Sequence, residues 1–336
     1  METSKTKIVI ATGIYPPDIG GPAPYAFHLY NNLKESCGDV ALVVFPKKRF
    51  FRHVVCFMNL IISSWRRDVI IALDTASVGV PAALCAFIFR KRLIIRVGGD
   101  FVWESYVNRV KSNVPLSAFY KKVPTGSLSL SEQVTKALTV FVLRVAYRVA
   151  FNSKWQADIW TDEYKIDPSK VAIVHNHFER NEKVLMNRNE NNKIFIASAR
   201  QIHLKNMDLI LEIFDELQKN GFEVGVDGGR YSHEELILRM QNAYAIIVLS
   251  VSDIAPNLIL EGLALGKPFV LTRENGLDDN FLKCGIVVDV NNREDIKRGI
   301  KLLLDNGVYS DCVSHIKNLT NRTWEQVVSD ILALAK

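Results

Sequence analysis

The chain has 336 residues, 48% of them hydrophobic and 23% charged, which is typical of a globular protein with two domains and excludes a largely disordered chain. The net charge of +6 is small for this length, so we expect no nucleic-acid partner. Five scattered cysteines without a Cys-x-x-Cys pair predict neither a disulfide framework nor a zinc site, and they favour a reducing, cytoplasmic setting.

The N-terminal sequence and the apolar runs indicate neither secretion nor a segment that spans a membrane. METSKTK leads directly into an apolar strand without the pattern of a signal peptide, and no apolar run reaches the ~18 to 20 residues that cross a bilayer. We therefore expect a cytoplasmic protein that is either soluble or attached peripherally to the inner face of a membrane.

Short β-branched runs alternate with helix-length segments through the first half of the chain. This alternation predicts a doubly wound parallel sheet, in which ligands bind at the carboxyl ends of the strands. The predicted strands cover residues 7–12, 40–45, 69–73, 93–97 and 146–151.

A Pro/Gly-rich loop follows the first predicted strand and precedes a helix with Tyr25, Leu29 and Leu33 at intervals of four. Gly20 and Gly21 in this loop would let the backbone approach a ligand closely. The loop lacks the G-x-G-x-x-G spacing of dinucleotide-binding proteins. A plain tight turn is the alternative interpretation.

Three stretches of the first half, residues 45–67, 82–92 and 109–122, combine Lys and Arg with aromatic residues. Basic and aromatic side chains together are what attachment to an anionic membrane surface requires. The alternative is that these stretches are core helices of the sheet domain, with their basic residues at solvated ends.

The polar run NRNENNK separates two apolar regions and predicts the domain boundary. We expect an N-terminal domain over residues 1–186, a linker over 187–193 and a C-terminal domain over 194–320. A last helix within residues 321–336, containing Trp324, is expected to return to the first domain.

The second domain begins with a strand-like segment over residues 194–198, and the loop after it carries Arg200 and Lys205 before an amphipathic helix. Two cations at the carboxyl end of a strand, near a helix N-terminus, can neutralise a diphosphate leaving group. Ordinary solvated charges are the alternative.

Residues 250–268 lie between two predicted strands, 245–249 and 269–272, and predict a crossover helix with proline near its start and Gly-Lys-Pro at its end. The N-terminus of such a helix can hold a phosphate through its free N–H groups. Asp253 precedes the helix, while Glu261 lies inside it among apolar residues, where a lone carboxylate needs a partner. The alternative is a helix-capping Asp and a Glu that is paired within the core.

The spacing Asp253-x7-Glu261 resembles the acidic E-x7-E signature of retaining GT-B glycosyltransferases, and its surroundings, S-D-x-x-P-N-x-x-x-E-x-x-A-x-G-x-P, are similar to glycosyltransferase family 4. The spacing Arg200-x4-Lys205 resembles the G-R-x-x-x-x-K-G element of this family, and the Pro/Gly-rich loop resembles its Y-P-P-x-x-G-G loop. The resemblance implies an α/β protein of the GT-B fold, with two Rossmann-like doubly wound parallel-sheet domains facing a cleft. The second domain looks abridged, because one strand-helix unit of the family is missing before the acidic motif.

The resemblance also implies roles for these residues. Arg200 and Lys205 would stabilise the leaving diphosphate. Asp253 would act at the donor sugar, and Glu261 would bind the ribose. The other donor-binding residues would be Gly20, Gly21, Asn257 and Leu258. Asp100, after the strand 93–97, would contact a sugar hydroxyl, with capping of the following helix as the alternative. No metal or other cofactor is required.

The implied function is that of a retaining, hexosyltransferase-type enzyme. It would move a sugar from a nucleotide diphosphate donor to a glycan or lipid-linked acceptor, in cell-surface polysaccharide or lipopolysaccharide synthesis. Two alternatives stay open, a nucleotide-sugar epimerase and a degenerate GT-B scaffold that binds a partner. The second is favoured by Gly98, which stands where many relatives have His, by Asp253, which stands where Glu is usual, and by the abridged second domain.

Overall fold

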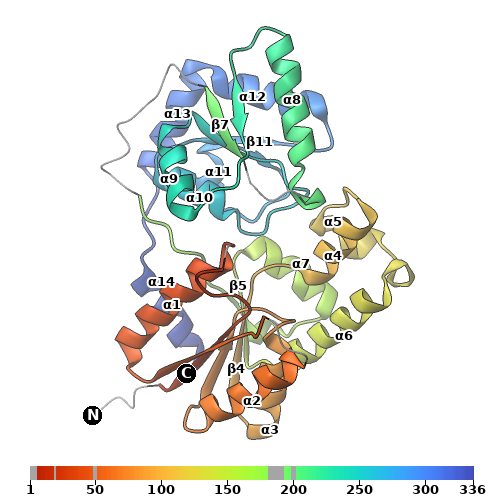
Figure 1. Ribbon diagram of the computed structural model, residues 1–336, viewed down its shortest axis with the longest axis vertical. Helices are drawn as coiled ribbons and strands as arrows, with labels where there is room; N and C mark the ends of the chain where they lie inside the picture. The colour runs from red at the N-terminus through yellow and green to blue at the C-terminus, as the bar shows by residue number, and fades with distance from the viewer. Residues whose placement is uncertain (1–5, 19, 48–50, 181–192, 198–201) are drawn as a thin grey trace. The chain divides into compact units, whose positions relative to one another are not determined.

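The computed structural model describes residues 1–336 except 1–5, 19, 48–50, 181–192 and 198–201. The chain forms two compact units (Figure 1). Unit 1 comprises residues 1–103, 123–177 and 323–336, and unit 2 comprises residues 104–122 and 178–322. The C-terminal segment thus lies in unit 1, whereas residues 104–122, which the sequence analysis assigns to the first domain, lie in unit 2. Most of the predicted linker, 187–192, lies outside the described residues.

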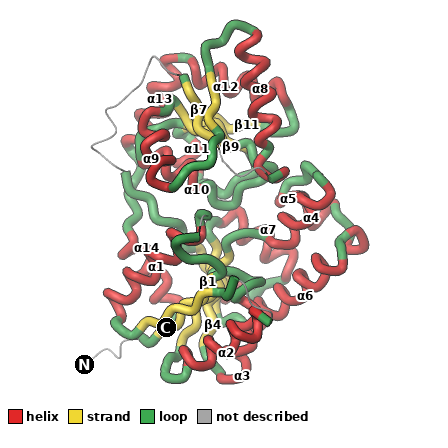
Figure 2. The backbone as a smooth tube through the Cα atoms, viewed as in Figure 1, coloured by secondary structure: helices red, strands yellow, loops and turns green. Residues whose placement is uncertain are grey.

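Unit 1 is built on a six-stranded sheet, whose strands are yellow in Figure 2. Its order is β2-β1-β3-β4-β5-β6, and the paired strands run parallel. The predicted doubly wound parallel sheet is therefore confirmed. Its strands are β1 (Ile8–Thr12), β2 (Val40–Val44), β3 (Val69–Ala72), β4 (Arg92–Val97), β5 (Arg148–Phe151) and β6 (Val171–Ile173).

The helices of unit 1 cover both faces of this sheet because alternate strand residues, most of them apolar, point to opposite sides. On one face, Val9 and Ala11 belong to the same core as residues of α2, α3, α6 and α7. On the other face, Ile8 and Ile10 pack with α1 and α14. The helices are α1 (Pro22–Cys37), α2 (Arg52–Ser64), α3 (Gly79–Phe89), α6 (Leu130–Val145), α7 (Lys154–Tyr164) and α14 (Trp324–Leu334), with short 3-10 turns η1 (Thr125–Ser127) and η2 (Pro168–Lys170).

The C-terminal helix α14 is held to unit 1 by its first residue. The Trp324 ring stacks on His28 at a centroid distance of 5.2 Å and on His177 at 5.3 Å, so it lies between two imidazoles. Val327 and Ile331 of the same helix are buried in the unit 1 core. An aromatic anchor and an apolar stripe together explain how the last helix returns to the N-terminal sheet.

Unit 2 contains a five-stranded parallel sheet of order β11-β10-β9-β7-β8, one strand fewer than unit 1, so the predicted abridgement is confirmed. Its strands are β7 (Ile194–Ala197), β8 (Gly225–Asp227), β9 (Ala245–Val248), β10 (Phe269–Thr272) and β11 (Gly285–Val288).

The helices of unit 2 also cover both faces of their sheet. Helices α8, α12 and α13 share a core with one face, and α9, α10 and α11 pack on the other. Their bounds are α8 (Met207–Lys219), α9 (His233–Asn242), α10 (Asn257–Ala264), α11 (Asp279–Leu282), α12 (Arg293–Leu304) and α13 (Asn306–Lys317), with η3 (His203–Lys205) before α8. Two further helices, α4 (Phe101–Val110) and α5 (Leu116–Lys122), bring the segment 104–122 into unit 2. No helix in the described part of the chain is both long and apolar enough to cross a bilayer.

Candidate functional site

The order of the strands in unit 2 reverses at β7. The chain passes from β7 to its neighbour β8 on one side, and then to β9, β10 and β11 on the other side. In open parallel sheets, ligands bind at the carboxyl ends of the two strands where the order reverses, which are here β7 and β9. The loops after these two strands carry the predicted cations and Asp253.

Lys205 and Asp253 come together at this point. Lys205 Nζ lies 2.7 Å from Asp253 Oδ2 and 3.3 Å from Ser250 Oγ, and Ser250 Oγ donates a hydrogen bond of 3.2 Å to the same carboxylate oxygen. Both charged side chains are only 13% exposed. Lys205 and Asp253, from the loops after adjacent strands, therefore form an ion pair that is largely shielded from water. Arg200 lies outside the described residues.

Backbone hydrogen bonds fasten the three loops at this edge of the sheet. Val251 N donates to Leu204 O at 3.0 Å, which joins the loop after β9 to the loop after β7. Asp253 N donates to Glu274 O at 2.8 Å, which joins it to the loop after β10. The position of the Asp253 carboxylate is thus set by main-chain contacts on both sides.

Helix α10 follows the Asp253 loop, and Asn257 and Leu258 are its first two residues. Pro256 is its N-cap, so the predicted proline does lie at the start of the helix. No side chain caps this N-terminus. The positive end of the helix dipole is therefore available to an anion at the same edge.

Glu261 lies in the second turn of α10, and among the described residues its carboxylate has neither a hydrogen-bond nor an ion-pair partner. The alternative of a Glu paired within the core finds no support there. Burial raises the pKa of this carboxyl, and the nearby His233 opposes the rise only in part. The next residue, Gly262, packs on β9, where an added Cβ would come within 2.3 Å of Ile246 Cγ1, so the glycine lets α10 lie close to the sheet.

Glu274, after β10, belongs to the same edge and was not predicted. Its Oε2 is buried without a hydrogen-bond partner in the described structure, and its carbonyl oxygen accepts the hydrogen bond from Asp253 N. The signal in the sequence is only its place directly after a predicted strand. Ser250, which bonds both Lys205 and Asp253, was missed for the same reason.

The segment 104–122 braces the loops that carry the predicted residues. Asn108 Oδ1 accepts a hydrogen bond from Leu204 N at 3.3 Å, and Leu116 N donates to Ser252 Oγ at 3.0 Å. His203 Nε2 lies 3.1 Å from the carbonyl oxygen of Ser112. Residues from the first half of the chain thereby help to position the loops of Lys205 and Asp253.

Three of the predicted residues, Asp100, Gly20 and Gly21, belong to unit 1. Asp100 is fully buried, and its Oδ1 accepts a hydrogen bond of 2.9 Å from Trp103 N at the start of α4, as a capping residue does. Gly20 has φ of +146°, which favours glycine, and Gly21 is the N-cap of α1. Contacts of these residues with a ligand stay a prediction.

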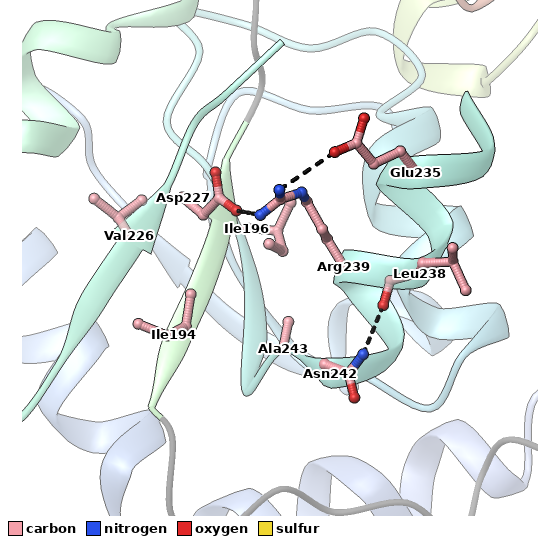
Figure 3. Close-up of a pocket in the computed structure, with 9 residues that line it drawn as sticks. All are labelled: Ile194, Ile196, Val226, Asp227, Glu235, Leu238, Arg239, Asn242 and Ala243. Carbon is pink, nitrogen blue, oxygen red and sulfur yellow. Dashed lines mark hydrogen bonds and ion pairs between the residues drawn. The ribbon is translucent and has the colours of Figure 1, made fainter. Parts of the chain in front are cut away.

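A cavity of about 540 Å³ opens elsewhere in unit 2, and none of the predicted residues lines it (Figure 3). It lies between the strands β7 and β8 and helix α9, at the end of the sheet where the abridged domain has no further strand. Arg239 crosses it to Asp227 at 3.0 Å and to Glu235 at 3.3 Å. Burial acts to raise the pKa of Asp227, but hydrogen bonds from Tyr231 and Gly229 and the charge of Arg239 outweigh it and lower the pKa.

Metal ligands do not gather anywhere in the described residues, which contain no cluster of three or more His, Cys, Asp or Glu side chains able to hold a metal ion. At the edge described above, the structure brings together the Lys205 ammonium, the Ser250 hydroxyl and the Asp253 carboxylate, close in the chain to the N-terminus of α10. Such a set can bind a polar ligand that carries both negative charge and hydroxyl groups.

Comparison with known proteins gives similarity in structure but not in sequence. No family model matches the chain, and no curated protein matches it significantly. HepE of Anabaena in complex with UDP aligns with a TM-score of 0.65 and 12% identity over 98% of this chain and 99% of that one. Sucrose-phosphate synthase of Thermosynechococcus elongatus aligns with a TM-score of 0.68 and 12% identity over 98% of both chains.

The chain has the GT-B fold. A third similar structure, a protein assigned as a UDP-N-acetylglucosamine 2-epimerase from Listeria monocytogenes, aligns with a TM-score of 0.57 and 13% identity over 98% of this chain and 95% of that one. At such identities the likeness establishes the two Rossmann-like domains and leaves the chemistry to the residues of the site.

Proposed function

We propose that this GT-B protein is a retaining, hexosyltransferase-type glycosyltransferase of the family 4 kind. It takes a sugar from a nucleotide diphosphate donor and transfers it to a glycan or lipid-linked acceptor, in the cytoplasm, for cell-surface polysaccharide or lipopolysaccharide synthesis. The observation that carries the proposal is the meeting of Lys205 and Asp253 at the point where the strand order of unit 2 reverses. Sugar-nucleotide chemistry needs a cation for the diphosphate and acids for the hydroxyl groups at one place.

In the proposed reaction each of these side chains has a task. Cleavage of the bond between the sugar and the diphosphate builds negative charge on the leaving group, and Lys205, Arg200 and the N-terminus of α10 oppose that charge. Because Lys205 is bonded to Asp253, it must turn part of its hydrogen bonding to the phosphate when the donor binds. Asp253 is then released to accept a hydrogen bond from the sugar.

Glu261 is suited to the ribose. A carboxylate without a partner can accept hydrogen bonds from two neighbouring hydroxyl groups, and burial makes such bonds stronger than they are in water. The residues Gly20, Gly21, Asn257, Leu258 and Asp100 complete the proposed donor and sugar contacts. None of these tasks calls for a metal.

The decisive experiment is calorimetric titration of the full chain with UDP, ADP and GDP in the presence of a chelator. Binding of one of them, weakened in Lys205→Ala and in Glu261→Gln but not in Lys219→Ala, supports the proposal. Lys219 is a suitable control because it is an exposed lysine of unit 2 paired with Asp215. If none of the three binds at millimolar concentration, the chain is a degenerate scaffold and the proposal is withdrawn.

A nucleotide-sugar epimerase is the second candidate, and the similarity to the assigned 2-epimerase favours it over other classes. The two reactions differ in their products. Once the donor has been found by a thermal-shift screen of sugar nucleotides, incubation without acceptor separates them. A transferase releases at most free sugar and nucleotide by slow hydrolysis, whereas an epimerase yields an isomeric sugar nucleotide.

A further inference from the structure

Helices α2 and α3 lie next to each other on one face of the unit 1 sheet (Figure 1). Their inner sides are fully packed, since Cys56, Leu60, Ala82 and Ala86 are buried in the core that this face shares. Ser64 Oγ of α2 lies 3.4 Å from Cys85 Sγ of α3, which fixes the two helices side by side near their C-terminal ends.

The outer sides of both helices are apolar as well. Along α2 the exposed apolar residues recur at intervals of three or four, which places them on one stripe, and α3 repeats the pattern. Trp65 is 76% exposed, Ile62 72% and Phe87 68%. We call these residues the α2/α3 face: Val54, Met58, Ile62, Trp65, Leu84, Phe87 and Ile88.

Folding of unit 1 does not account for this face. Its core is closed by the inner stripes, and the outer side chains gain nothing from the sheet while they expose large apolar groups to water. Single exposed apolar residues are common on proteins, but several on two neighbouring helices are typical of an interaction site.

Three cations border the α2/α3 face. Arg66 follows Trp65 at the end of α2, and Arg90 and Lys91 follow the end of α3. These two ends lie together, because Arg92 N, at the start of β4, donates a hydrogen bond of 3.0 Å to the carbonyl oxygen of Asp68, just before β3. Among the described residues, none of these three cations has an ion-pair partner.

Acids are missing from both helices and their ends, since residues 51–67 and 79–92 contain no Asp or Glu. The exposed Arg52 adds a cation at the start of α2. Two acids lie close to the end of α2. Asp39 is paired with Arg67 at 2.6 Å, and Asp68, the residue after Arg67, is exposed. The face therefore combines a wide apolar centre, an indole at one end and a basic border.

We propose that the α2/α3 face binds the surface of an anionic lipid bilayer. The apolar side chains enter the boundary between headgroups and acyl chains, the Trp65 indole lies at headgroup depth, and Arg66, Arg90 and Lys91 contact acidic headgroups. The apolar side chains alone would suit a second protein chain equally well, and the unpaired basic border selects the anionic bilayer. The third basic and aromatic stretch, 109–122, is not part of the face, because it lies in unit 2 with Leu116 and Phe119 buried.

The test is co-sedimentation of the full chain with vesicles of phosphatidylcholine alone and with vesicles that also contain phosphatidylglycerol, at low and high salt. The parent should bind only the vesicles with phosphatidylglycerol, and more weakly at high salt. Trp65→Ser with Phe87→Ser should weaken binding by roughly tenfold or more, and Arg66→Glu with Arg90→Glu by at least about thirtyfold.

Matched variants in unit 2 keep the test specific. Leu238→Ser removes an exposed leucine from α9, and Lys283→Glu with Lys301→Glu makes the same change in net charge as the arginine pair. Both should bind vesicles as the parent does. All substituted positions are exposed, so unfolding midpoints close to that of the parent are expected and are measured alongside.

Three results would overturn the proposal: no vesicle binding by the parent, equal binding to neutral vesicles, or binding that the Trp65/Phe87 variant retains. A dimer in solution that this variant abolishes would assign the face to a second copy of the chain instead. The outcome is independent of nucleotide binding, since it uses neither donor nor the residues of the unit 2 site.

Discussion

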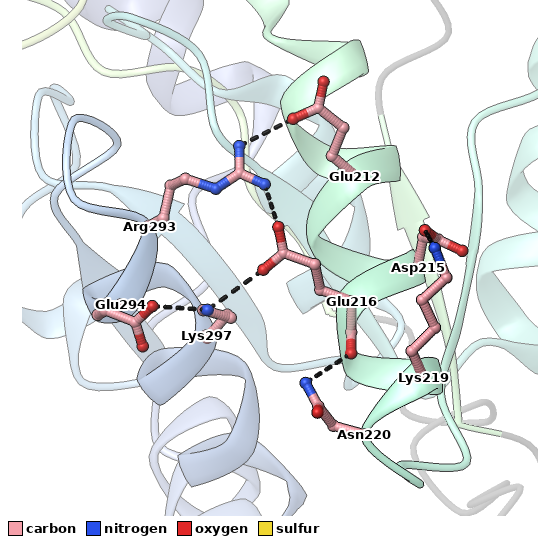
Figure 4. Close-up of polar contacts among 8 residues, drawn as sticks. All are labelled: Glu212, Asp215, Glu216, Lys219, Asn220, Arg293, Glu294 and Lys297. Carbon is pink, nitrogen blue, oxygen red and sulfur yellow. Dashed lines mark hydrogen bonds and ion pairs between the residues drawn. The ribbon is translucent and has the colours of Figure 1, made fainter.

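The α2/α3 pair of unit 1 and the α8/α12 pair of unit 2 cover one face of a parallel sheet in the same way, yet their outer sides are opposites. On α8 and α12 the outer side carries charged residues that pair with one another (Figure 4), with Leu211 and Leu302 as single exposed apolar side chains. Arg293 lies 2.8 Å from Glu212 and also pairs with Glu216, which Lys297 approaches to 3.2 Å. On α2 and α3 the corresponding side is apolar and carries no acid.

The difference separates two kinds of constraint on a helix. The inner stripe is dictated by the sheet, and both pairs meet that demand with buried aliphatic residues such as Leu60 and Ile300. The outer stripe is free to suit its surroundings. Charged pairs suit water, because exposed ion pairs add little to stability but keep a surface soluble. The α2/α3 face is therefore consistent with a binding partner outside the folded unit.

The largest expected effect is a loss of stability when a buried residue of either helix pair is truncated. The comparison predicts similar losses in the two units, and unequal losses would contradict it. Leu60→Ala and Ile300→Ala each remove a fully buried side chain, and each should lower the free energy of unfolding of its own unit by about 2 to 5 kcal/mol. Urea unfolding followed by circular dichroism measures the loss. Leu60→Met, which nearly conserves volume, should cost less than about 1.5 kcal/mol. A negligible effect in one unit would mean that its helix pair is not part of a packed core.

A second prediction concerns the candidate nucleotide site of unit 2. Glu261→Gln should weaken binding of a nucleoside diphosphate by roughly tenfold, since a hydrogen bond to a charged acceptor is lost. In titrations, Lys219→Ala should bind as the parent does. If Glu261→Gln bound as tightly as the parent, the carboxylate would have no part in holding the ribose.

The same substitution should change stability in a pH-dependent way. The pKa of Glu261 is raised above the ordinary value of 4.5 by burial, so its protonated form favours the folded state. That contribution is complete below pH 4.5 and is lost as the pH rises through the raised pKa. Without ligand, Glu261→Gln should therefore be more stable than the parent at pH 7 and equal to it at pH 4, measured by thermal unfolding. A gain at pH 4 as large as that at pH 7 would assign the effect to packing.

The sequence was sufficient for the strands and helices that carry the candidate site. The strand predicted at 269–272 is β10 residue for residue, and the helix bearing Glu261 was predicted from its place between two strands and from the proline and glycine at its ends. Such signals are local, however, and they cannot show that Leu116 N donates to Ser252 Oγ, 136 residues away. Glu274 was missed because a carboxylate next to a strand end becomes significant only when the neighbouring strand is known.

The outer stripes could not be predicted for a different reason. A buried helix and an interfacial helix share the same spacing of apolar residues, so residues 45–67 and 82–92 were compatible with both interpretations. The structure gives both answers for α2, since Leu60 is buried and Ile62 is exposed. Which stripe faces the sheet depends on the direction in which the chain leaves β2, and that is a tertiary property.

A third prediction concerns a variant in which the exposed side of α2 and α3 is made charged, like that of α8 and α12. Trp65→Glu with Phe87→Lys gives α2 and α3 the charged character of α8 and α12 at two exposed positions. Thermal unfolding should change by no more than about 2 °C, because neither side chain is buried in the core. Binding to phosphatidylglycerol vesicles should be lost. A large loss of stability would show that the α2/α3 face is required by unit 1 itself, which would remove the contrast between the units.

The smallest expected effect comes from the charged pair of helices. Arg293→Ala breaks two exposed ion pairs and should shift the thermal midpoint by about 1 °C or less, and by less still at high salt. Hydrogen bonds from Arg293 and Lys297 lower the pKa of Glu216, so what stability the network adds is present above pH 4.5 and is lost as the pH falls through the lowered value. The variant and the parent should then converge in acid. A destabilisation as large as that of Ile300→Ala would mean that the outer stripe of unit 2 is structural, and that only the outer stripe of unit 1 is free of the fold.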